Sequence, residues 1–202
     1  LEKQIVDNKK PNSFELNASA KLNTEVKEIE SISWNVGGLL RGTDKELSNE
    51  YVAIGGHFDH LGWGKQNSLY QGEPMIHNGA DDNASGTTGV LELSEKFASE
   101  KNNLKRSVLF FAFSGEELGL LGSNYLVNHF PVPIENVVTM INMDMIGRLK
   151  DSSLIVYGTG TSSNWKTLLN EKNSYGFKLT FNDDGFGPSD HSSFYGKKIP
   201  VL

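Results

Sequence analysis

The chain has 202 residues, of which 37% are apolar, and a formal charge of -6 with a pI near 5.4. This length is enough for one well-formed hydrophobic core, so we expect one main domain. The acidic balance argues against a nucleic-acid partner, no apolar stretch is long enough to span a membrane, and the lack of cysteine excludes disulfides, thiolate ligands and cysteine nucleophiles. Any bound metal would therefore be held by His, Asp and Glu.

The N-terminal region is polar. We interpret residues 1–17 as a linker or the tail of a preceding region, followed by a domain over residues 18–202. No secretory signal is visible and the first residues do not resemble a natural start, so we interpret the chain as an excised or processed piece. The alternation of apolar and polar residues over 18–41 predicts two extended segments that end at Gly37-Gly38.

Strands and helices are predicted to alternate along the rest of the chain. Compact apolar runs predict strands at residues 51–57, 107–113, 137–143, 154–157 and 177–181. Helical periodicity predicts helices directly after residue 86, at 117–129 and at 165–173. This alternation predicts an α/β fold whose largely parallel or mixed sheet is covered by helices on both faces.

Polar residues directly follow three of the predicted strands. His57 ends the first, Glu116 and Glu117 follow the second, and Asp144 follows the third. Because ligands of open α/β sheets gather at the carboxyl ends of the strands, we expect these side chains to share one edge of the sheet.

A fourth contribution comes from the turn Asn78–Gly86, which carries the adjacent carboxylates Asp81 and Asp82. Taken alone, such a turn is typical of a helix N-cap. Together with the strand-end residues, however, this turn would bring several carboxylates close together. Their mutual repulsion is relieved when a divalent cation binds among them. Imidazole and carboxylate ligands suit zinc, with manganese or cobalt as alternatives, and a pair of ions bridged by one carboxylate is used by aminopeptidases.

Two neighbouring pairs of residues suggest a division of roles. Asp59 is placed to accept a hydrogen bond from the ring N–H of a metal-bound His57. For His57 taken alone, the alternative is a buried histidine with a purely structural role. Of Glu116 and Glu117, one could bind metal while the other faces the substrate as a general base. The alternative for the two glutamates is a favourable interaction with a helix dipole.

The other histidines are less informative. His191, in Ser189-Asp190-His191, is the remaining histidine that residue type alone would name as a ligand, and a helix cap is the alternative for Ser189 and Asp190. His77 and His129 are interpreted as structural. His60, in the loop beside the expected site, stays open.

Five motifs, GGHFDH, GADDNASG, SGEELGLLGS, NMDMIG and SDHSSF, in this order resemble the co-catalytic di-zinc aminopeptidase family. The resemblance covers about residues 35–202. The family includes bacterial leucyl aminopeptidases, and its relatives include glutamate carboxypeptidase II, glutaminyl cyclase and the non-catalytic transferrin receptor. The resemblance implies a three-layer α/β/α sandwich with a central mixed, mostly parallel sheet.

The resemblance also implies a metal-ligand set. His57 and Asp144 would bind one zinc ion, Asp82 would bridge two ions, and Glu117 would bind the other. Glu116 would be the general base that deprotonates a metal-bridging water. The peptide bond after Asp82 is often cis in this family.

Further residues match less directly. Asp59 is counted with the catalytic residues, and Asp190 matches an active-site carboxylate near the substrate. His191 matches a group that contacts either the substrate or the metal ligands. The family takes its second histidine ligand from a later Tyr-His-x-x-x-Asp motif. We therefore expect the domain to be incomplete at its C-terminus, with one of its two zinc sites lacking a ligand.

The implied function is that of a secreted zinc-dependent exopeptidase, an aminopeptidase acting on peptides in the periplasm or outside the cell. A glutaminyl-cyclase-like acyl transferase is one alternative, which is disfavoured because those relatives work with one zinc ion. A non-catalytic binding or dimerisation module is the other, which is disfavoured because the chain keeps four ligands and the base.

Overall fold

The computed structural model describes residues 2–11, 13–15, 18–27, 30–64 and 68–202. The chain divides into two compact units, residues 1–32 and 33–202. In the first unit, α1 (Glu2–Asn8) is the only helix or strand among the described residues. The domain boundary expected between residues 17 and 18 stays a prediction.

The two extended segments expected over residues 18–41 reduce to one strand, β1 (Val36–Leu40), in the part that the structure describes. Leu22 and Val26, from the alternating pattern, are 85% and 95% exposed. Alternation favours a strand only where a neighbouring strand and a core cover one face, and these side chains have no such cover.

The main sheet contains β1, β2 (Tyr51–His57), β3 (Ser107–Phe113) and β4 (Val137–Asn142) in the order β1-β3-β2-β4. β2 lies between β3 and β4 and is parallel to both, whereas β1 is antiparallel to β3. The central sheet is therefore mixed and mostly parallel, as predicted. The carboxyl ends of β2, β3 and β4 meet at one edge.

The far edge of β4 is covered by the last residues of the chain. Met140 and Val201 form a parallel bridge, and the backbone N–H of Leu202 donates a 3.0 Å hydrogen bond to the carbonyl oxygen of Met140. The backbone N–H of Asn142 in turn donates a 2.9 Å hydrogen bond to the carbonyl oxygen of Leu202. The parallel pairing thus continues beyond β4.

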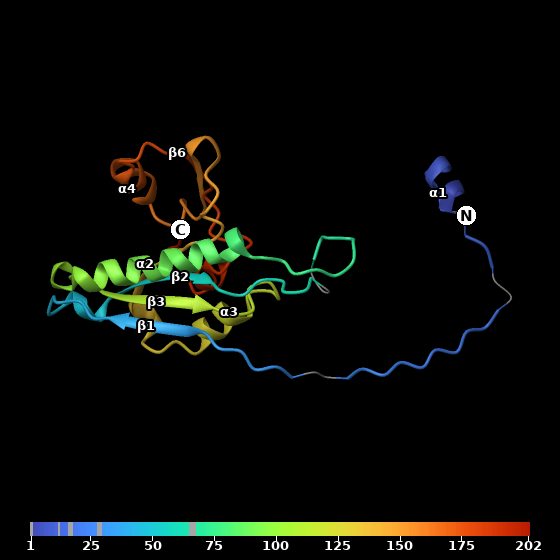
Figure 1. The fold of residues 1–202 in the computed structure, drawn as a ribbon, viewed down its shortest axis with the longest axis horizontal. Helices are drawn as coiled ribbons and strands as arrows, with labels where there is room; N and C mark the ends of the chain where they lie inside the picture. The colour runs from blue at the N-terminus through green and yellow to red at the C-terminus, as the bar shows by residue number, and fades with distance from the viewer. Residues whose placement is uncertain (1, 12, 16–17, 28–29, 65–67) are drawn as a thin grey trace. The chain divides into compact units, whose positions relative to one another are not determined.

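Helices cover both faces of this sheet, as Figure 1 shows for α2 and α3. On one face, Ile54 and Phe110 pack with Val90 of α2 (Gly86–Ser99). On the other, the strands pack against Leu126 of α3 (Leu121–Asn128) and Phe194 of α5 (His191–Tyr195). This is the predicted three-layer α/β/α arrangement.

The remaining elements form a smaller substructure. β5 (Ser153–Val156) and β6 (Lys178–Phe181) pair in parallel, and α4 (Trp165–Lys172) connects them. Single 3-10 turns occupy Leu47–Asn49, Lys101–Asn103, Ile134–Asn136 and Lys150–Ser152. Among the described residues, every helix is too short or too polar to cross a lipid bilayer.

One helix differs from its predicted bounds in a way that matters for the site. α3 begins at Leu121 rather than at Glu117. Gly119 and Leu120 have φ angles of 103° and 60°, which no right-handed helix contains. Glu116 and Glu117 therefore lie in a turn before the helix and not on its first turn.

Candidate metal centre

His57 anchors the centre at the end of β2. Its side chain is fully buried, and its Nδ1 lies 3.1 Å from the carbonyl oxygen of Asp59. Because a carbonyl oxygen can only accept, this contact places a proton on Nδ1, so that in the neutral ring the lone pair is on Nε2. The hydroxyl of Thr87 donates to the carbonyl oxygen of His57 at 2.7 Å and holds the main chain in place.

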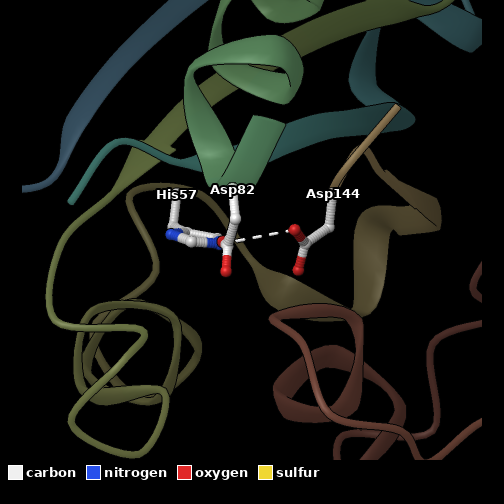
Figure 2. A group of neighbouring side chains, drawn as sticks. All are labelled: His57, Asp82 and Asp144. Atoms are coloured by element: carbon white, nitrogen blue, oxygen red, sulfur yellow. Dashed lines mark ion pairs between the residues drawn. The ribbon is translucent and has the colours of Figure 1, made fainter. Parts of the chain in front are cut away.

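The lone pair of His57 faces carboxylates, and Figure 2 shows the side chains of His57, Asp82 and Asp144 converging. Nε2 lies 3.3 Å from Oδ1 of Asp82, 3.5 Å from Oδ1 of Asp144 and 3.8 Å from Oε2 of Glu116. It has no hydrogen-bond partner among the described residues. Two donor atoms bound to one tetrahedral zinc ion at about 2.1 Å lie about 3.4 Å apart, so His57, Asp82 and Asp144 fit zinc.

The charge of this cluster is compensated by a proton when no cation is bound. Burial disfavours the imidazolium of His57, but the negative charges of Asp144 and Glu116 outweigh it and raise the pKa of His57 to about 9. Burial also raises the pKa of Asp82, and the neighbouring Asp144 adds to the rise. Both shifts show a site that favours additional positive charge.

Asp82 lies in the irregular turn Ala80–Ser85, whose Asp82–Asn83 peptide bond is cis, as the resemblance implies. Asn83 is buried, and its side-chain oxygen accepts hydrogen bonds from the backbone N–H of Gly86 at 2.9 Å and of Met145 at 3.3 Å. This side chain thus connects the turn to the segment that carries the next ligand.

Asp81 has a different task from Asp82. Its Oδ1 accepts hydrogen bonds from the backbone N–H of Gly147 at 2.9 Å and from the hydroxyl of Ser85 at 3.3 Å. Asp81 therefore ties the turn to the chain after β4, whereas Asp82 is the carboxylate that faces His57. The residues alone could not assign these two roles, because adjacent aspartates in a turn are equivalent as cap residues.

Asp144 follows β4 and is oriented by a serine. Oδ2 of Asp144 accepts a 2.6 Å hydrogen bond from the hydroxyl of Ser189, which itself accepts one from the side-chain amide of Asn142 at 2.8 Å. Burial opposes ionisation of Asp144, but His57 and Ser189 outweigh it and lower its pKa. Sequence reasoning missed this role of Ser189, since a serine before a short helix is equally typical of a cap.

Glu116 and Glu117 extend from the turn after β3. Oδ1 of Asp59 accepts a 3.2 Å hydrogen bond from the backbone N–H of Glu116 and lies 3.7 Å from Nδ1 of His57. The expected contact with His57 is thus made by the main-chain carbonyl of Asp59, and its carboxylate orients Glu116. Burial raises the pKa of Glu116 to about 7 despite the opposing effect of His57, a value that suits a general base near neutral pH.

A second donor group lies beside the first. His60, which the sequence left open, has its Nδ1 2.6 Å from Oε1 of Glu117 and 3.8 Å from Oδ2 of Asp82. One donor atom from each of these three residues lies within 4.8 Å of the others. Its position three residues after His57, in the same strand-end loop, is the signal that could have identified it.

The segment Ser189-Asp190-His191 is more fully buried from solvent than expected. Asp190 is fully buried at the start of α5, and burial raises its pKa to about 6. His191 is 4% exposed, and burial lowers its pKa. Neither donor group found among the described residues includes His191. The predicted roles of Asp190 and His191, contact with the substrate or with the metal ligands, stay predictions.

The two histidines interpreted as structural lie outside both donor groups of the described chain. His77 has its Nε2 3.0 Å from the hydroxyl of Ser68, and His129 has its Nδ1 2.9 Å from the carbonyl oxygen of Tyr125 at the end of α3. Both rings are thus occupied by local hydrogen bonds.

Comparison with protein families agrees with this geometry. The model of peptidase family M28 matches residues 35–202. The chain belongs to this family. Both donor groups and Glu116 lie within the matched residues.

Curated members of related sequence are longer than this chain. A probable zinc metalloprotease of Pyrenophora tritici-repentis is 40% identical over 106 residues, which cover 52% of this chain and 23% of that protein. A probable leucine aminopeptidase 2 of Arthroderma benhamiae is 28% identical over 179 residues, which cover 84% of this chain and 32% of that protein. The chain thus spans a third or less of these two relatives.

Solved structures share the M28 fold. BSAP, a zinc aminopeptidase from Bacillus subtilis, superposes with a TM-score of 0.62 at 26% identity and covers 83% of this chain and 38% of its own. A glutaminyl cyclase from Porphyromonas gingivalis gives a TM-score of 0.63 at 21% identity, covering 83% and 61%. The latter likeness shows the common fold alone.

Proposed function

We propose that this M28 chain is the catalytic part of a zinc-dependent exopeptidase, an aminopeptidase that releases the N-terminal residue of peptides. The observation that carries the proposal is the position of His57 Nε2, 3.3 Å from Asp82 and 3.5 Å from Asp144, with Glu116 at 3.8 Å. A buried imidazole lone pair among carboxylates fits a metal ligand, and the related proteins named as zinc aminopeptidases support the choice of zinc.

The proposed ligand set has two parts. His57, Asp82 and Asp144 would hold one zinc ion, and Asp82 and Glu117 would contribute ligands to a second. When bound, zinc lowers the pKa of a coordinated water and polarises the scissile carbonyl. Hydrogen bonds from neighbouring residues, such as the one from Ser189 to Asp144, orient these ligands.

The proton transfer falls to Glu116. Its carboxylate takes a proton from the attacking water as the water oxygen bonds to the carbonyl carbon. It then gives that proton to the amine nitrogen as the peptide C–N bond breaks. Asp59 holds the main chain of Glu116 through the 3.2 Å hydrogen bond to its N–H. Burial, aided by the negative charges of Asp190 and Asp144, keeps the pKa of Glu116 high enough for it to act as a base.

Three wider aspects of the proposal rest on the family resemblance. Residues 18–202 would form the peptidase domain. Peptides with a free N-terminus would be the substrates, and the protein would act in the periplasm or outside the cell.

The test compares hydrolysis of leucine amide and short peptides by the chain and by Glu116→Gln. We expect Glu116→Gln to lose about 10²–10⁴-fold in kcat, the usual contribution of a general base, while its zinc content stays unchanged. Glu92→Gln, an exposed glutamate on α2, is the matched control and should keep full activity. Appreciable turnover by Glu116→Gln, or hydrolysis of N-acetylated peptides at the same rate as free ones, would contradict the proposal.

A further inference from the structure

Residues 114–122 form a loop that connects β3 to the first turn of α3 and carries Glu116, the proposed base. Three residues of this loop have left-handed backbone angles: φ is 69° at Gly115, 103° at Gly119 and 60° at Leu120. Such angles are costly for a leucine, and they persist where the surrounding structure holds the chain in place. The position of Glu116 therefore depends on the contacts that hold this loop.

Several hydrogen bonds shape the loop from within. The carbonyl oxygen of Glu116 accepts hydrogen bonds from the backbone N–H of Gly119 at 2.8 Å and of Leu120 at 2.9 Å. The backbone N–H of Leu121 donates a 3.0 Å hydrogen bond to the carbonyl oxygen of Gly115. These bonds fold the loop on itself, but they do not attach it to the sheet.

Asn35 attaches both ends of the loop to the sheet. Its side-chain oxygen accepts a 3.1 Å hydrogen bond from the backbone N–H of Ser114, and its side-chain amide donates a 2.8 Å hydrogen bond to the carbonyl oxygen of Gly122. Since one partner can only donate and the other can only accept, a single orientation of the Asn35 amide satisfies both. The side chain of one residue thus joins the first and last residues of the loop.

The two ends of the loop approach each other closely at Gly122. A Cβ atom at this position would lie 2.3 Å from the carbonyl oxygen of Ser114 and 2.4 Å from Oδ1 of Asn35, so glycine is needed there. Asn35 itself directly precedes β1, where Val36 pairs with Ala112 of β3. The side chain that closes the loop therefore extends from a strand that is hydrogen-bonded to the sheet.

We propose that Asn35 is a positioning residue for Glu116, which it holds beside the metal centre by fixing both ends of the loop. The inference rests on the proposed function, in which Glu116 is the general base. The Glu116 side chain is 11% exposed, and its Oε2 lies 3.8 Å from Nε2 of His57. Because a displacement of about 1 Å can cost about 100-fold in rate, a base on a loosened loop should be much less effective.

Asn173 offers a matched control. Like Asn35 it is partly buried, and it follows α4 in the smaller substructure. Its side-chain oxygen accepts a 2.9 Å hydrogen bond from the backbone N–H of Phe177, and its amide donates a 2.7 Å hydrogen bond to the carbonyl oxygen of Phe177. Asn173→Ala thus removes the same pair of contacts from a segment that carries none of the proposed site residues.

The first measurement is the hydrolysis of leucine amide at saturating zinc, under conditions where circular dichroism shows each variant to be folded. We expect Asn35→Ala to lose about 10–100-fold in kcat with KM changed by less than about twofold, because the base is displaced while substrate binding is kept. Asn173→Ala should keep both constants. An unchanged kcat in Asn35→Ala, or equal losses in the two variants, would overturn the inference.

A second variant covers the case in which Asn35→Ala does not fold. Asn35→Asp keeps the shape of the side chain and the acceptor for the N–H of Ser114, but it removes the donor to the carbonyl oxygen of Gly122. We expect the same fall in kcat at nearly constant KM. Full activity of this variant would contradict the role of Asn35.

The second measurement is ¹⁵N relaxation of the backbone amides, which needs no turnover. The order parameters of Gly119 and Leu120 should be near the rigid value of about 0.85 in the unchanged chain and in Asn173→Ala, and should fall below about 0.6 in Asn35→Ala. Ala53 in β2 should stay rigid in all three. A loop that is equally rigid without Asn35, or already flexible in the unchanged chain, would overturn the inference.

The inference and the proposed function can fail separately. If the loop loosens in Asn35→Ala but the unchanged chain cleaves no peptide, the function is contradicted and the attachment of the loop by Asn35 stands. If the chain cleaves peptides with the same kcat in the presence and absence of Asn35, the inference alone is contradicted.

Discussion

The side-chain amide nitrogen of Asn83 donates a 2.9 Å hydrogen bond to the carbonyl oxygen of Met143. Asn83 follows Asp82 directly, and Met143 precedes Asp144, so this contact helps to fix the distance between two proposed zinc ligands. Asn83 is 1% exposed, which places the contact in an environment where unpaired polar groups are costly.

We expect Asn83→Ala to lower the free energy of unfolding by about 2–4 kcal/mol, because it leaves buried backbone groups without their partners. Zinc affinity should fall by about 10–100-fold, the usual effect of removing a group that orients ligands. Urea denaturation and competitive zinc titration measure the two effects. Asn170→Ala, an exposed position on α4, should change stability by less than about 0.5 kcal/mol. Unchanged zinc affinity in Asn83→Ala would show that the turn holds its place without this side chain.

Ser189→Ala should weaken the first zinc site by about tenfold. The substitution removes the 2.6 Å hydrogen bond that orients Oδ2 of Asp144 and lowers its pKa, so the carboxylate should become both less fixed and harder to ionise. Zinc titration gives the affinity, and carboxyl ¹³C NMR of the metal-free protein should show a higher pKa for Asp144. The matched control is Ser99→Ala, whose exposed hydroxyl contacts only the last turn of α2. An equal loss of affinity in both variants would contradict the assignment.

The metal-free protein should lose stability as the pH rises from 7 to 10. The pKa of His57 is raised from 6.5 to about 9 in the folded state. The bound proton therefore stabilises the fold fully below pH 6.5, and this stabilisation is lost as the pH passes through about 9. The loss is on the order of 3 kcal/mol.

Urea denaturation at several pH values measures this loss. His57→Gln cannot bind this proton, so the loss of stability around pH 9 should disappear, leaving only a smaller decline near pH 7 from Glu116, whose pKa is raised to about 7. Saturating zinc should also remove the dependence, since a metal-bound imidazole is neutral at every pH in this range. A slope in His57→Gln equal to that of the unchanged chain would assign the pH dependence to other groups.

Sequence reasoning was most successful where burial alone decides structure. The strands ending at His57 and Phe113 match their predicted bounds, because a continuous apolar run buried on both faces has few alternatives. The polar residues at the strand ends then had to meet, since β2, β3 and β4 are parallel. The meeting of His57, Glu116 and Asp144 follows from these two facts.

The details that sequence reasoning missed depend on main-chain geometry. The helix expected from Glu117 starts later because Gly119 and Leu120 adopt left-handed backbone angles, and a leucine gives no warning of that conformation. The partner of His57 Nδ1 is the carbonyl of Asp59 rather than its carboxylate, and every residue carries a carbonyl. Contacts of this kind have no residue-type signature, so only coordinates reveal them.

The parallel arrangement of β2 with β3 and β4 also links metal supply to the survival of the folded chain. Parallel neighbours are joined by long crossovers, so the strand ends that carry the ligands come together only when these distant segments have paired. A zinc ion would then bind the folded chain and not the unfolded one. At a free concentration 100 times its Kd, one such ion adds about 2.7 kcal/mol to the free energy of unfolding. A shortage of zinc would therefore make this chain more susceptible to proteolysis, in addition to stopping the peptide hydrolysis that we propose for it.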